Sequence, residues 1–350
     1  MISIRSATLW AACLLPAPLW AGGIERGIPS MAFLFEEGTY LELTFTYAEP
    51  EISGVDRLGF AGGAATGNTV PPLFDAAFRY RQDLTERLSF GLVYDHPLGA
   101  DFDYPLGTGY YLQGSSAGMT SQALSALFRY EFADGVSVYG GLRVVEADGE
   151  ADIFFPVPYS VRADGSTELG YLLGVAYERP DYGLRVALTY QSATEHSFDT
   201  VENGVPTGRF SATVPQAITL EAQTGIAPDT LLIGGVRWVE WSEFAVATTV
   251  PLVAYEEDIF TYALGGVRRL SEAWAATALW THEPADGNTG GALDPTDGRD
   301  DLTLALTWTG EDVRLTGALT HSWIGDAEVD LGRFSDNTSL SGSLQLGIWF

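Results

Sequence analysis

The chain has one cysteine and little positive charge. Cys13 is the only cysteine among 350 residues, and it lies in an N-terminal segment with the features of an export signal. A mature chain without thiols has no disulfide and no cysteine-ligated metal site. Lysine plus arginine number 18 against 46 acidic residues, for a formal net charge of -28. Because such a surface repels phosphate backbones, the composition argues against nucleic acid as a partner.

Long hydrophobic runs are missing from the body of the chain. Hydrophobic residues make up 46% of the sequence and aromatic residues 12%, with 40 glycines. No apolar run beyond the N-terminus reaches the roughly 20 residues that a membrane helix needs. A helical membrane protein is therefore not expected.

The N-terminus resembles a cleavable secretory signal. Arg5 supplies a positive charge, residues 7–18 form an apolar core, and Ala21 precedes Gly22 at a suitable cleavage point. We therefore predict residues 1–21 as a signal peptide and an exported mature chain.

Beyond the signal, apolar and polar residues alternate in segments of about ten residues, the length of a tilted strand that crosses a bilayer. In residues 39–48, leucines and aromatics share one face, while Glu42, Thr44 and Thr46 share the other. One side then suits lipid and the opposite side suits water. The segments with this pattern are 39–48, 73–82, 87–96, 121–133, 136–146, 166–178, 182–192, 216–226, 230–241, 258–268, 273–283, 300–309, 312–323 and 339–350.

These fourteen segments predict an all-β fold, a transmembrane antiparallel β-barrel over residues 39–350. An even strand count returns both ends of the barrel to one side of the membrane, as in single-chain bacterial barrels. We therefore expect the bacterial outer membrane as the location. The last strand alternates up to Phe350, an ending that resembles the strand recognised by the outer-membrane assembly machinery.

The connections alternate between short and long, which is typical of outer-membrane barrels. The short ones, such as Asp134-Gly135 and Gly310-Glu311, contain the residues that tight turns require. We expect the long ones to be outer loops, and they are 49–72, 97–120, 147–165, 193–215, 242–257, 284–299 and 324–338.

A barrel of this width cannot be filled by its wall side chains alone, so it holds water, ligand or an inserted segment. The predicted inward faces carry charged and amide side chains, and a wetted or salt-bridged lumen wall is the simplest interpretation. Arg129 and Arg143 are also candidate ligand contacts. The inward residues are Glu42, Arg79, Arg81, Asp95, Arg129, Glu131, Arg143, Arg185, Glu221, Gln223, Arg237 and Arg314.

Two predicted outer loops are rich in apolar side chains. Apolar groups displayed outside a membrane usually mark a binding surface, so we interpret these residues as candidate contacts for a hydrophobic ligand. The alternative is that the loops pack on one another or contact lipopolysaccharide beside the outer-membrane lipid. The candidates are Phe102, Tyr104, Tyr110, Tyr111, Phe154 and Phe155.

Four short motifs add a family resemblance. Residues 215–220 read PQAITL, residues 225–228 GIAP, residues 238–244 WVEWSEF and residues 94–99 YDHPLG. Together with the strand count, they resemble the outer-membrane transporters of long-chain fatty acids, the FadL type. The Trp-x-x-Trp-Ser-x-Phe cluster is the most specific of the four.

The resemblance implies uptake of hydrophobic molecules such as long-chain fatty acids or hydrocarbons. Outer loops would capture the ligand, an N-terminal hatch would plug the barrel, and a kink in the third strand would release the ligand laterally. Residues 22–38 would form the hatch, with Phe33 and Phe35 as ligand contacts. Gly91 and Pro97 are the candidates for the kink and its gating, because both residue types disturb a β-ladder. The candidate hatch, residues 22–38, is shorter than the family's hatch and lacks its Asn-Pro-Ala element.

Two other functions stay open. One is a general porin or a structural or adhesive barrel, although porins usually have more strands. The other is an outer-membrane lipid hydrolase, which would need an imidazole base. His196 lies near Ser192 and Ser197, but no third member stands at a diagnostic spacing. We therefore expect a transporter and no enzyme.

No cofactor and no metal site is expected. An acidic cluster at Asp294, Asp297, Asp300 and Asp301 does not match the spacing of a calcium loop. We interpret the cluster as solvated surface.

Overall fold

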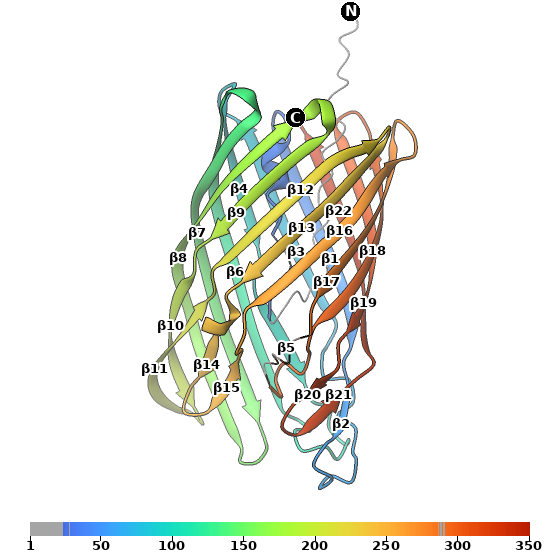
Figure 1. Cartoon of the computed structure of the whole chain (residues 1–350). Helices are drawn as coiled ribbons and strands as arrows, with labels where there is room; N and C mark the ends of the chain where they lie inside the picture. Colours follow the sequence, from blue (N-terminus) through green and yellow to red (C-terminus); the bar gives the residue numbers. More distant parts are fainter. Residues whose placement is uncertain (1–23, 28, 286, 288, 290) are drawn as a thin grey trace, which may run out of the picture.

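A computed structural model describes residues 24–350 except 28, 286, 288 and 290 (Figure 1). The predicted signal peptide and the first two residues of the predicted hatch lie outside this part. Within it, 17 strands are hydrogen-bonded into one antiparallel sheet, and this sheet closes because β1 pairs with both β3 and β22.

The strands of the wall follow the chain in order. They are β1 (Tyr40–Glu51), β3 (Leu73–Asp83), β4 (Leu88–Asp95), β5 (Gly99–Asp103), β6 (Ser116–Glu131), β7 (Val136–Ile153), β8 (Tyr159–Arg179), β9 (Leu184–Gln191), β10 (Thr194–Glu202), β11 (Val205–Val214), β12 (Ala217–Ala227), β13 (Thr230–Val239), β16 (Ile259–Arg269), β17 (Trp274–Glu283), β18 (Arg299–Thr309), β19 (Val313–Ile324) and β22 (Asn337–Trp349). Shorter elements lie outside the wall: β2 (Gly54–Asp56), β14 (Ala245–Ala247), β15 (Pro251–Ala254), β20 (Ala327–Glu328), β21 (Gly332–Phe334), η1 (Ala32–Phe35), η2 (Ala133–Gly135), η3 (Pro180–Tyr182) and η4 (Trp241–Glu243).

Three pairs of these strands each make one continuous wall strand, which leaves the fourteen that the sequence predicts. β9 and β10 run on in one register, since Gln191 faces Leu172 and Thr200 faces Ala163. β11 continues into β12 in the same way, and β4 continues into β5 after a bulge. The predicted fold class is therefore confirmed.

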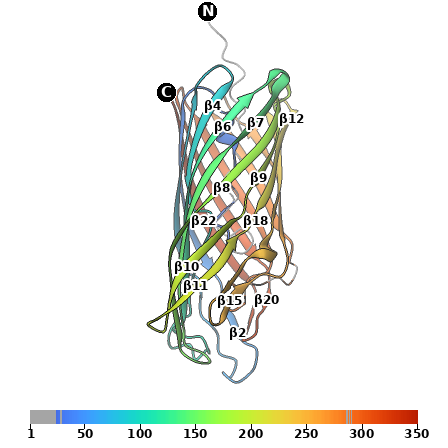
Figure 2. The same cartoon turned by 90° about the vertical axis from the view of Figure 1, so that its left-hand side faces the viewer.

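Two of the segments predicted as outer loops are mostly strand, so the prediction is wrong there. Most of residues 147–165 and nearly all of 193–215 are strand, so the β7–β8 and β10–β11 hairpins extend beyond the other strands (Figure 1 and Figure 2). The side chains of β10 still alternate between buried and exposed. Three of its four outward members, Glu195, Ser197 and Asp199, are polar, as expected for a strand that faces water rather than lipid. A search for apolar–polar alternation therefore misses these segments.

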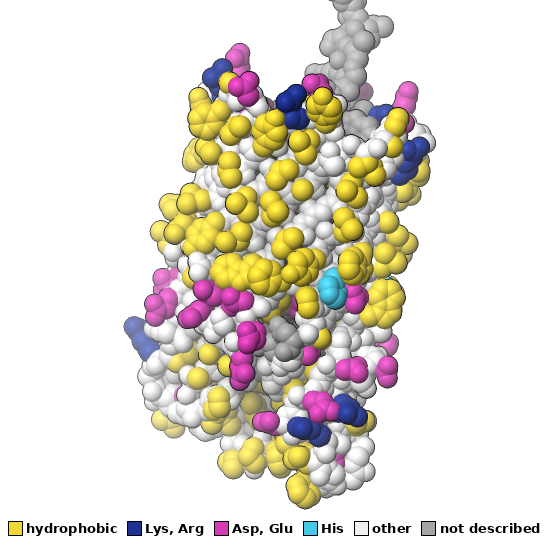
Figure 3. Space-filling view, in the orientation of Figure 1, with side chains coloured by type: hydrophobic (Ala, Val, Ile, Leu, Met, Phe, Trp, Pro, Cys, Tyr) yellow, Lys and Arg dark blue, Asp and Glu magenta, His cyan; other side chains and the backbone are white. Residues whose placement is uncertain are grey.

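The short connections lie at one end of the barrel, together with the C-terminus (Figure 1). We call this end the turn end and the opposite end, with the long connections, the loop end. Hydrophobic side chains cover the wall from the turn end downward, and acidic side chains gather below them (Figure 3). Leu188, Leu220 and Leu264 are among the exposed members of this belt.

The inward faces are polar, as predicted. Glu42, Arg79 and Arg314 are among the inward residues that are buried. No helix in the described part of the chain has the length and the apolar character needed to cross a bilayer.

Candidate functional site

The N-terminal segment from residue 24 to 38 packs against inward-facing side chains of the wall. Met31, Phe33 and Leu34 are buried in one apolar cluster with Leu127 and Tyr139. A Cβ on Gly91 would stand 2.5 Å from Leu34 Cδ2 and 3.1 Å from Phe33 Cε2. The absence of a side chain at this position of β4 is what lets the segment approach the wall.

Two ion pairs and two hydrogen bonds to a carboxylate tether the same segment to β12, β13 and β19. Arg237 Nε on β13 donates to both carboxylate oxygens of Glu25, at 3.1 and 3.0 Å. Arg314 Nη2 on β19 donates to Glu36 Oε1 at 2.7 Å. On β12, Glu221 accepts hydrogen bonds from the Ser30 hydroxyl at 2.6 Å and the Met31 amide at 3.3 Å.

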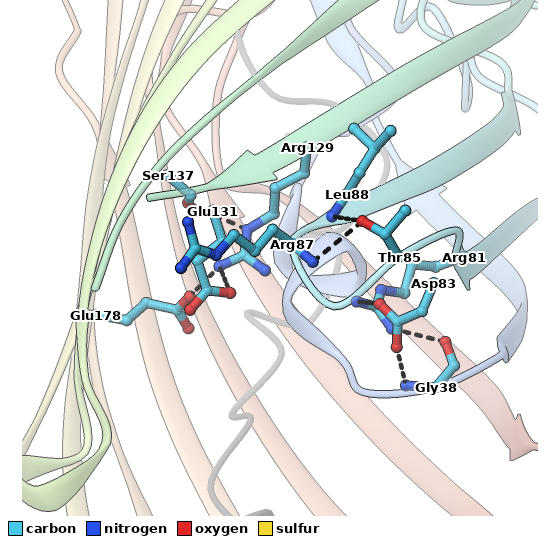
Figure 4. Close-up of polar contacts among 10 residues, drawn as sticks. All are labelled: Gly38, Arg81, Asp83, Thr85, Arg87, Leu88, Arg129, Glu131, Ser137 and Glu178. Atoms are coloured by element: carbon cyan, nitrogen blue, oxygen red, sulfur yellow. Dashed lines mark hydrogen bonds and ion pairs between the residues drawn. The ribbon is translucent and has the colours of Figure 1, made fainter. Parts of the chain in front are cut away.

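At the turn end, Phe35 lies between two arginines. The Arg129 and Arg185 guanidinium carbons stand 4.5 and 4.9 Å from its ring centroid. Arg129 also donates to Ser137 and Glu178 (Figure 4). Phe35 and Arg129, two predicted ligand contacts, therefore contact each other at the turn end, and Arg129 is also paired with Glu178.

Gly38 closes the segment at the turn end. Its amide donates to Asp83 at 2.9 Å, and Arg81 donates to both the Gly38 carbonyl and Asp83 (Figure 4). The segment is therefore held by hydrogen bonds or ion pairs along its described length.

The loop end has its own apolar core. Phe102, Tyr104 and Tyr110 are buried in it, and the two tyrosine rings stack with centroids 5.7 Å apart. Burial raises the pKa of Tyr110 to about 12 and that of Tyr104 still further. Because these side chains pack on one another, Phe102, Tyr104 and Tyr110 follow the alternative of loops that pack together and are not displayed outward.

The remaining loop candidates are more accessible. Phe154 is 54% exposed and Phe155 is 37% exposed. The Phe155 ring contacts Tyr111 with centroids 5.1 Å apart, and the Tyr111 hydroxyl donates to Asp56 at 2.8 Å. These three rings border the packed core on its solvent side.

An apolar cavity of about 100 Å³ lies at the loop end. Ile24 of the N-terminal segment lines it together with Phe102 of β5, Phe198 of β10 and Phe210 of β11. The last two rings stack with centroids 5.1 Å apart. The extended β10–β11 hairpin, which the residue pattern predicts as a loop, thus supplies part of the cavity wall.

The third wall strand is interrupted between β4 and β5. β4 pairs with β6 as far as Asp95 and Ala123, and β5 resumes the pairing at Gly99 and Thr120. Residues 96–98 therefore oppose only two residues of β6. One extra residue makes a bulge that bends the strand and disrupts its ladder.

The other edge of this strand is also incomplete. The β3–β4 pairing starts at Phe78 and Tyr94 and runs toward the turn end. Among the described strands, residues 73–77 of β3 therefore pair only with β1. A side-chain contact spans this break in the wall, because His96 Nδ1 lies 2.7 Å from Asp75 Oδ1.

The N-terminal segment covers the break from inside. The Arg26 amide donates to the Pro97 carbonyl at 3.0 Å, and the Gly99 amide donates to the Ile24 carbonyl at 2.9 Å. Arg26 also pairs with Asp101 at 3.3 Å. A smaller, polar pocket of about 50 Å³ lies here, lined by Arg26, Pro97 and inward residues of β1, β3, β7 and β9.

No protein-family model and no curated protein matches the sequence. Solved structures do match. A Pseudomonas aeruginosa FadL homologue is 13% identical, with a TM-score of 0.72 over 91% of this chain and 91% of that chain. The chain has the FadL-type barrel fold.

Two further structures agree. The P. putida toluene transporter TodX is 12% identical, with a TM-score of 0.66 over 90% of both chains. The Ralstonia pickettii toluene transporter TbuX is 12% identical, with a TM-score of 0.63 over 91% of this chain and 90% of that chain. At these identities the likeness establishes the fold.

Within the FadL-type fold, the two kink candidates differ. Pro97 lies in the break, whereas Gly91 pairs with Arg81 and Leu127 in an unbroken ladder. The expected irregularity is therefore not at Gly91, whose role is close packing against Leu34. Arg143, the other predicted arginine contact, lines the polar pocket and pairs with Asp95 at 3.2 Å.

The Trp-x-x-Trp-Ser-x-Phe motif anchors the loop after β13. Trp241 and Phe244 are buried against Tyr255, with ring centroids 5.1 and 5.9 Å from it. Trp238 and Ser242 both donate to Asp258, at 2.9 and 2.6 Å. Phe244 also lines the apolar cavity. The sequence did not predict this role, and its only signal was that Phe244 belongs to the motif.

The acidic cluster is not solvated surface as a whole. Asp294 and Asp301 are buried. Tyr255 and Thr296 donate to Asp294 at 2.5 and 2.9 Å. Among the described residues, no group of His, Cys, Asp and Glu is arranged to hold a metal ion.

His196 is a buried residue of β10 and not a loop histidine. Its Nε2 lies 3.0 Å from Thr194 Oγ1, and its Nδ1 lies 3.2 Å from the Ser166 carbonyl oxygen. Both ring nitrogens thus face partners of the packed wall rather than a serine nucleophile.

Proposed function

We propose that this chain is an outer-membrane transporter that takes up hydrophobic small molecules. The observation that carries the proposal is the position of Ile24 between two features. Ile24 lines the apolar cavity at the loop end, and its carbonyl accepts a hydrogen bond from Gly99 at the break in the wall. Movement of one short segment would therefore join a hydrophobic pocket to an opening toward lipid.

Residues 22–38 act as the hatch in this proposal. Their ion pairs with Arg237 and Arg314 hold the lumen closed in the resting state. Phe154 and Phe155, the exposed rings of the loop end, make the first contact with cargo, while Phe33 and Phe35, in the hatch itself, contact it inside the lumen. Pro97 gates the lateral exit.

The size of the cavity bears on the cargo. A dry engineered cavity of about 150 Å³ binds benzene, and the cavity here measures about 100 Å³. A single aromatic ring or the end of an alkyl chain would enter after a small adjustment. Toluene transporters and a monoaromatic hydrocarbon channel are among the solved structures with this fold, which supports this size class.

The outer-membrane location rests on the apolar belt and the fold. Phe350 is 79% exposed at the end of the last wall strand, where the assembly machinery could recognise it. The belt would contact outer-membrane lipid, and the acidic band below it would meet lipopolysaccharide through divalent cations.

Binding to the purified protein tests the function. Ala151→Leu should fill the cavity, because Ala151 is buried in its wall, and should weaken binding of toluene and of a long-chain fatty acid at least tenfold. Ala318→Leu is the control, since Ala318 is buried away from the cavity. If neither compound binds the unmodified protein, and it conducts ions steadily in a planar bilayer, the chain is a general porin.

A further inference from the structure

The polar pocket behind the break in the wall contains hydrogen-bonding atoms that the chain does not use. Arg26 Nε, Thr44 Oγ1, Arg143 Nε and Gln191 Oε1 are buried and have no hydrogen-bond partner in the described part of the chain. All four residues line this one pocket. They come from the N-terminal segment, β1, β7 and β9, so the arrangement does not follow from one local turn.

Unpartnered buried polar groups are costly. Each costs about 1–3 kcal/mol when nothing replaces its lost water, and native interiors hold few of them. Several in one pocket therefore indicate a missing partner. Three of the four can donate, so the partner must offer an accepting oxygen.

The pocket's own carboxylates are already engaged. Glu25 is bound by Arg237, Asp75 by His96 and Asp95 by Arg143. The carboxylates that line the pocket are therefore not the missing partners of the unused donors. An oxygen from outside the chain, on a bound molecule, is the group that fits.

We propose that this pocket binds the oxygen-bearing head group of an amphipathic cargo, a hydroxyl or a carboxyl group. The inference rests on the proposed transport function and deepens it. The pocket, at about 50 Å³, is half the size of the apolar cavity and exceeds the roughly 10–15 Å³ that one water needs. It is large enough for a head group and too small for a ring or a chain.

The apolar part of such a cargo has a place nearby. Ile24 lines the apolar cavity, and the next two residues, Glu25 and Arg26, line the polar pocket. The two spaces therefore meet at one stretch of the N-terminal segment. A cargo that is apolar at one end and carries oxygen at the other matches both.

Thr44→Val tests the head-group site. Valine keeps the shape of threonine and breaks no hydrogen bond within the described chain, because the Thr44 hydroxyl makes none. The control is Thr320→Val, which removes another buried lumen hydroxyl, bonded to Thr303 at 2.7 Å. Toluene, benzyl alcohol and benzoate form a ligand series that shares one ring.

Benzyl alcohol or benzoate should bind the unmodified protein more tightly than toluene does. Thr44→Val should weaken binding of the oxygenated ligand about 3- to 10-fold, the value of one hydrogen bond, and leave the affinity for toluene unchanged. Thr320→Val should preserve the preference.

Arg143→Lys gives a second measurement. Lysine keeps a positive charge toward Asp95 but lacks the Nε donor, so the same selective loss is expected. If toluene binds as well as the oxygenated ligands and both variants leave all affinities unchanged, the pocket holds water only and the head-group site is wrong, while the proposed function stands. If neither these three ligands nor a long-chain fatty acid binds the unmodified protein, both proposals fail.

Discussion

Glu25 and Arg237 form a buried ion pair between the N-terminal segment and strand β13, although they lie 212 residues apart in the sequence. Arg237 also donates to Thr219 at 2.6 Å, so its guanidinium is held from two sides. Breaking a buried pair leaves an uncompensated charge and typically costs about 3–5 kcal/mol. The pair is therefore a strong determinant of the closed position of the segment.

Glu25→Ala should release the N-terminal segment from the break in the wall. Hydrogen exchange of residues 24–38 should become faster, and the ion conductance of single barrels should rise. The double variant Glu25→Met with Arg237→Met removes both charges and should restore much of the protection. If the single variant exchanges and conducts like the unmodified protein, the pair does not hold the segment.

Gly91→Ala should loosen the same segment from a different side. The new methyl group would overlap Leu34 and Phe33, and overpacking of this kind costs about 1–3 kcal/mol. We expect faster exchange or proteolysis of residues 31–35 with the barrel intact. Gly317→Ala is the matched control, because a Cβ there meets nothing within 4 Å. Equal behaviour of the two variants would show that the close approach at Gly91 is unimportant.

The loop that contains Asp294 should be sensitive to pH. Burial raises the pKa of Asp294 above its ordinary value of 3.8, against the opposing hydrogen bonds from Tyr255 and Thr296. A carboxyl group with a raised pKa in the folded state stabilises the fold fully below the unfolded pKa, and this contribution is lost as the pH rises through the folded pKa. Local stability should therefore fall as the pH rises above about 4.

Limited proteolysis of residues 284–299 across pH 4 to 9 measures this effect. Cleavage of the unmodified protein should increase with pH after correction for the protease's own pH profile. Asp294→Asn, which stays neutral and can still accept from Tyr255, should flatten the curve. A slope that survives in Asp294→Asn would assign the pH dependence to another group.

The fold could be predicted because its physical cause is local. Each wall strand meets lipid on one face and the lumen on the other, so a segment such as 39–48 carries the alternation in its own residues. The prediction failed at 193–215, where water lies outside the strand and the outward residues are polar. The alternation there is one of burial, which appears only when the neighbouring strands are in place.

The candidate site was predictable only in part. The family resemblance pointed to the N-terminal segment and to Pro97, and apolar side chains outside a strand pattern pointed to the aromatic loop residues. The sequence misplaced Tyr104 and Tyr110, since nothing local distinguishes a tyrosine that is displayed from one that packs under another loop.

By itself, the sequence determined a closed barrel with a polar interior and an apolar belt, because these follow from which residue types neighbour one another along the chain. Only the tertiary structure decided that Glu25 meets Arg237, that Ile24 stands between cavity and wall break, and that Thr44 and Arg143 share a pocket. Such contacts join residues far apart in the chain, and they depend on strand register and on closure of the barrel, which no single segment encodes.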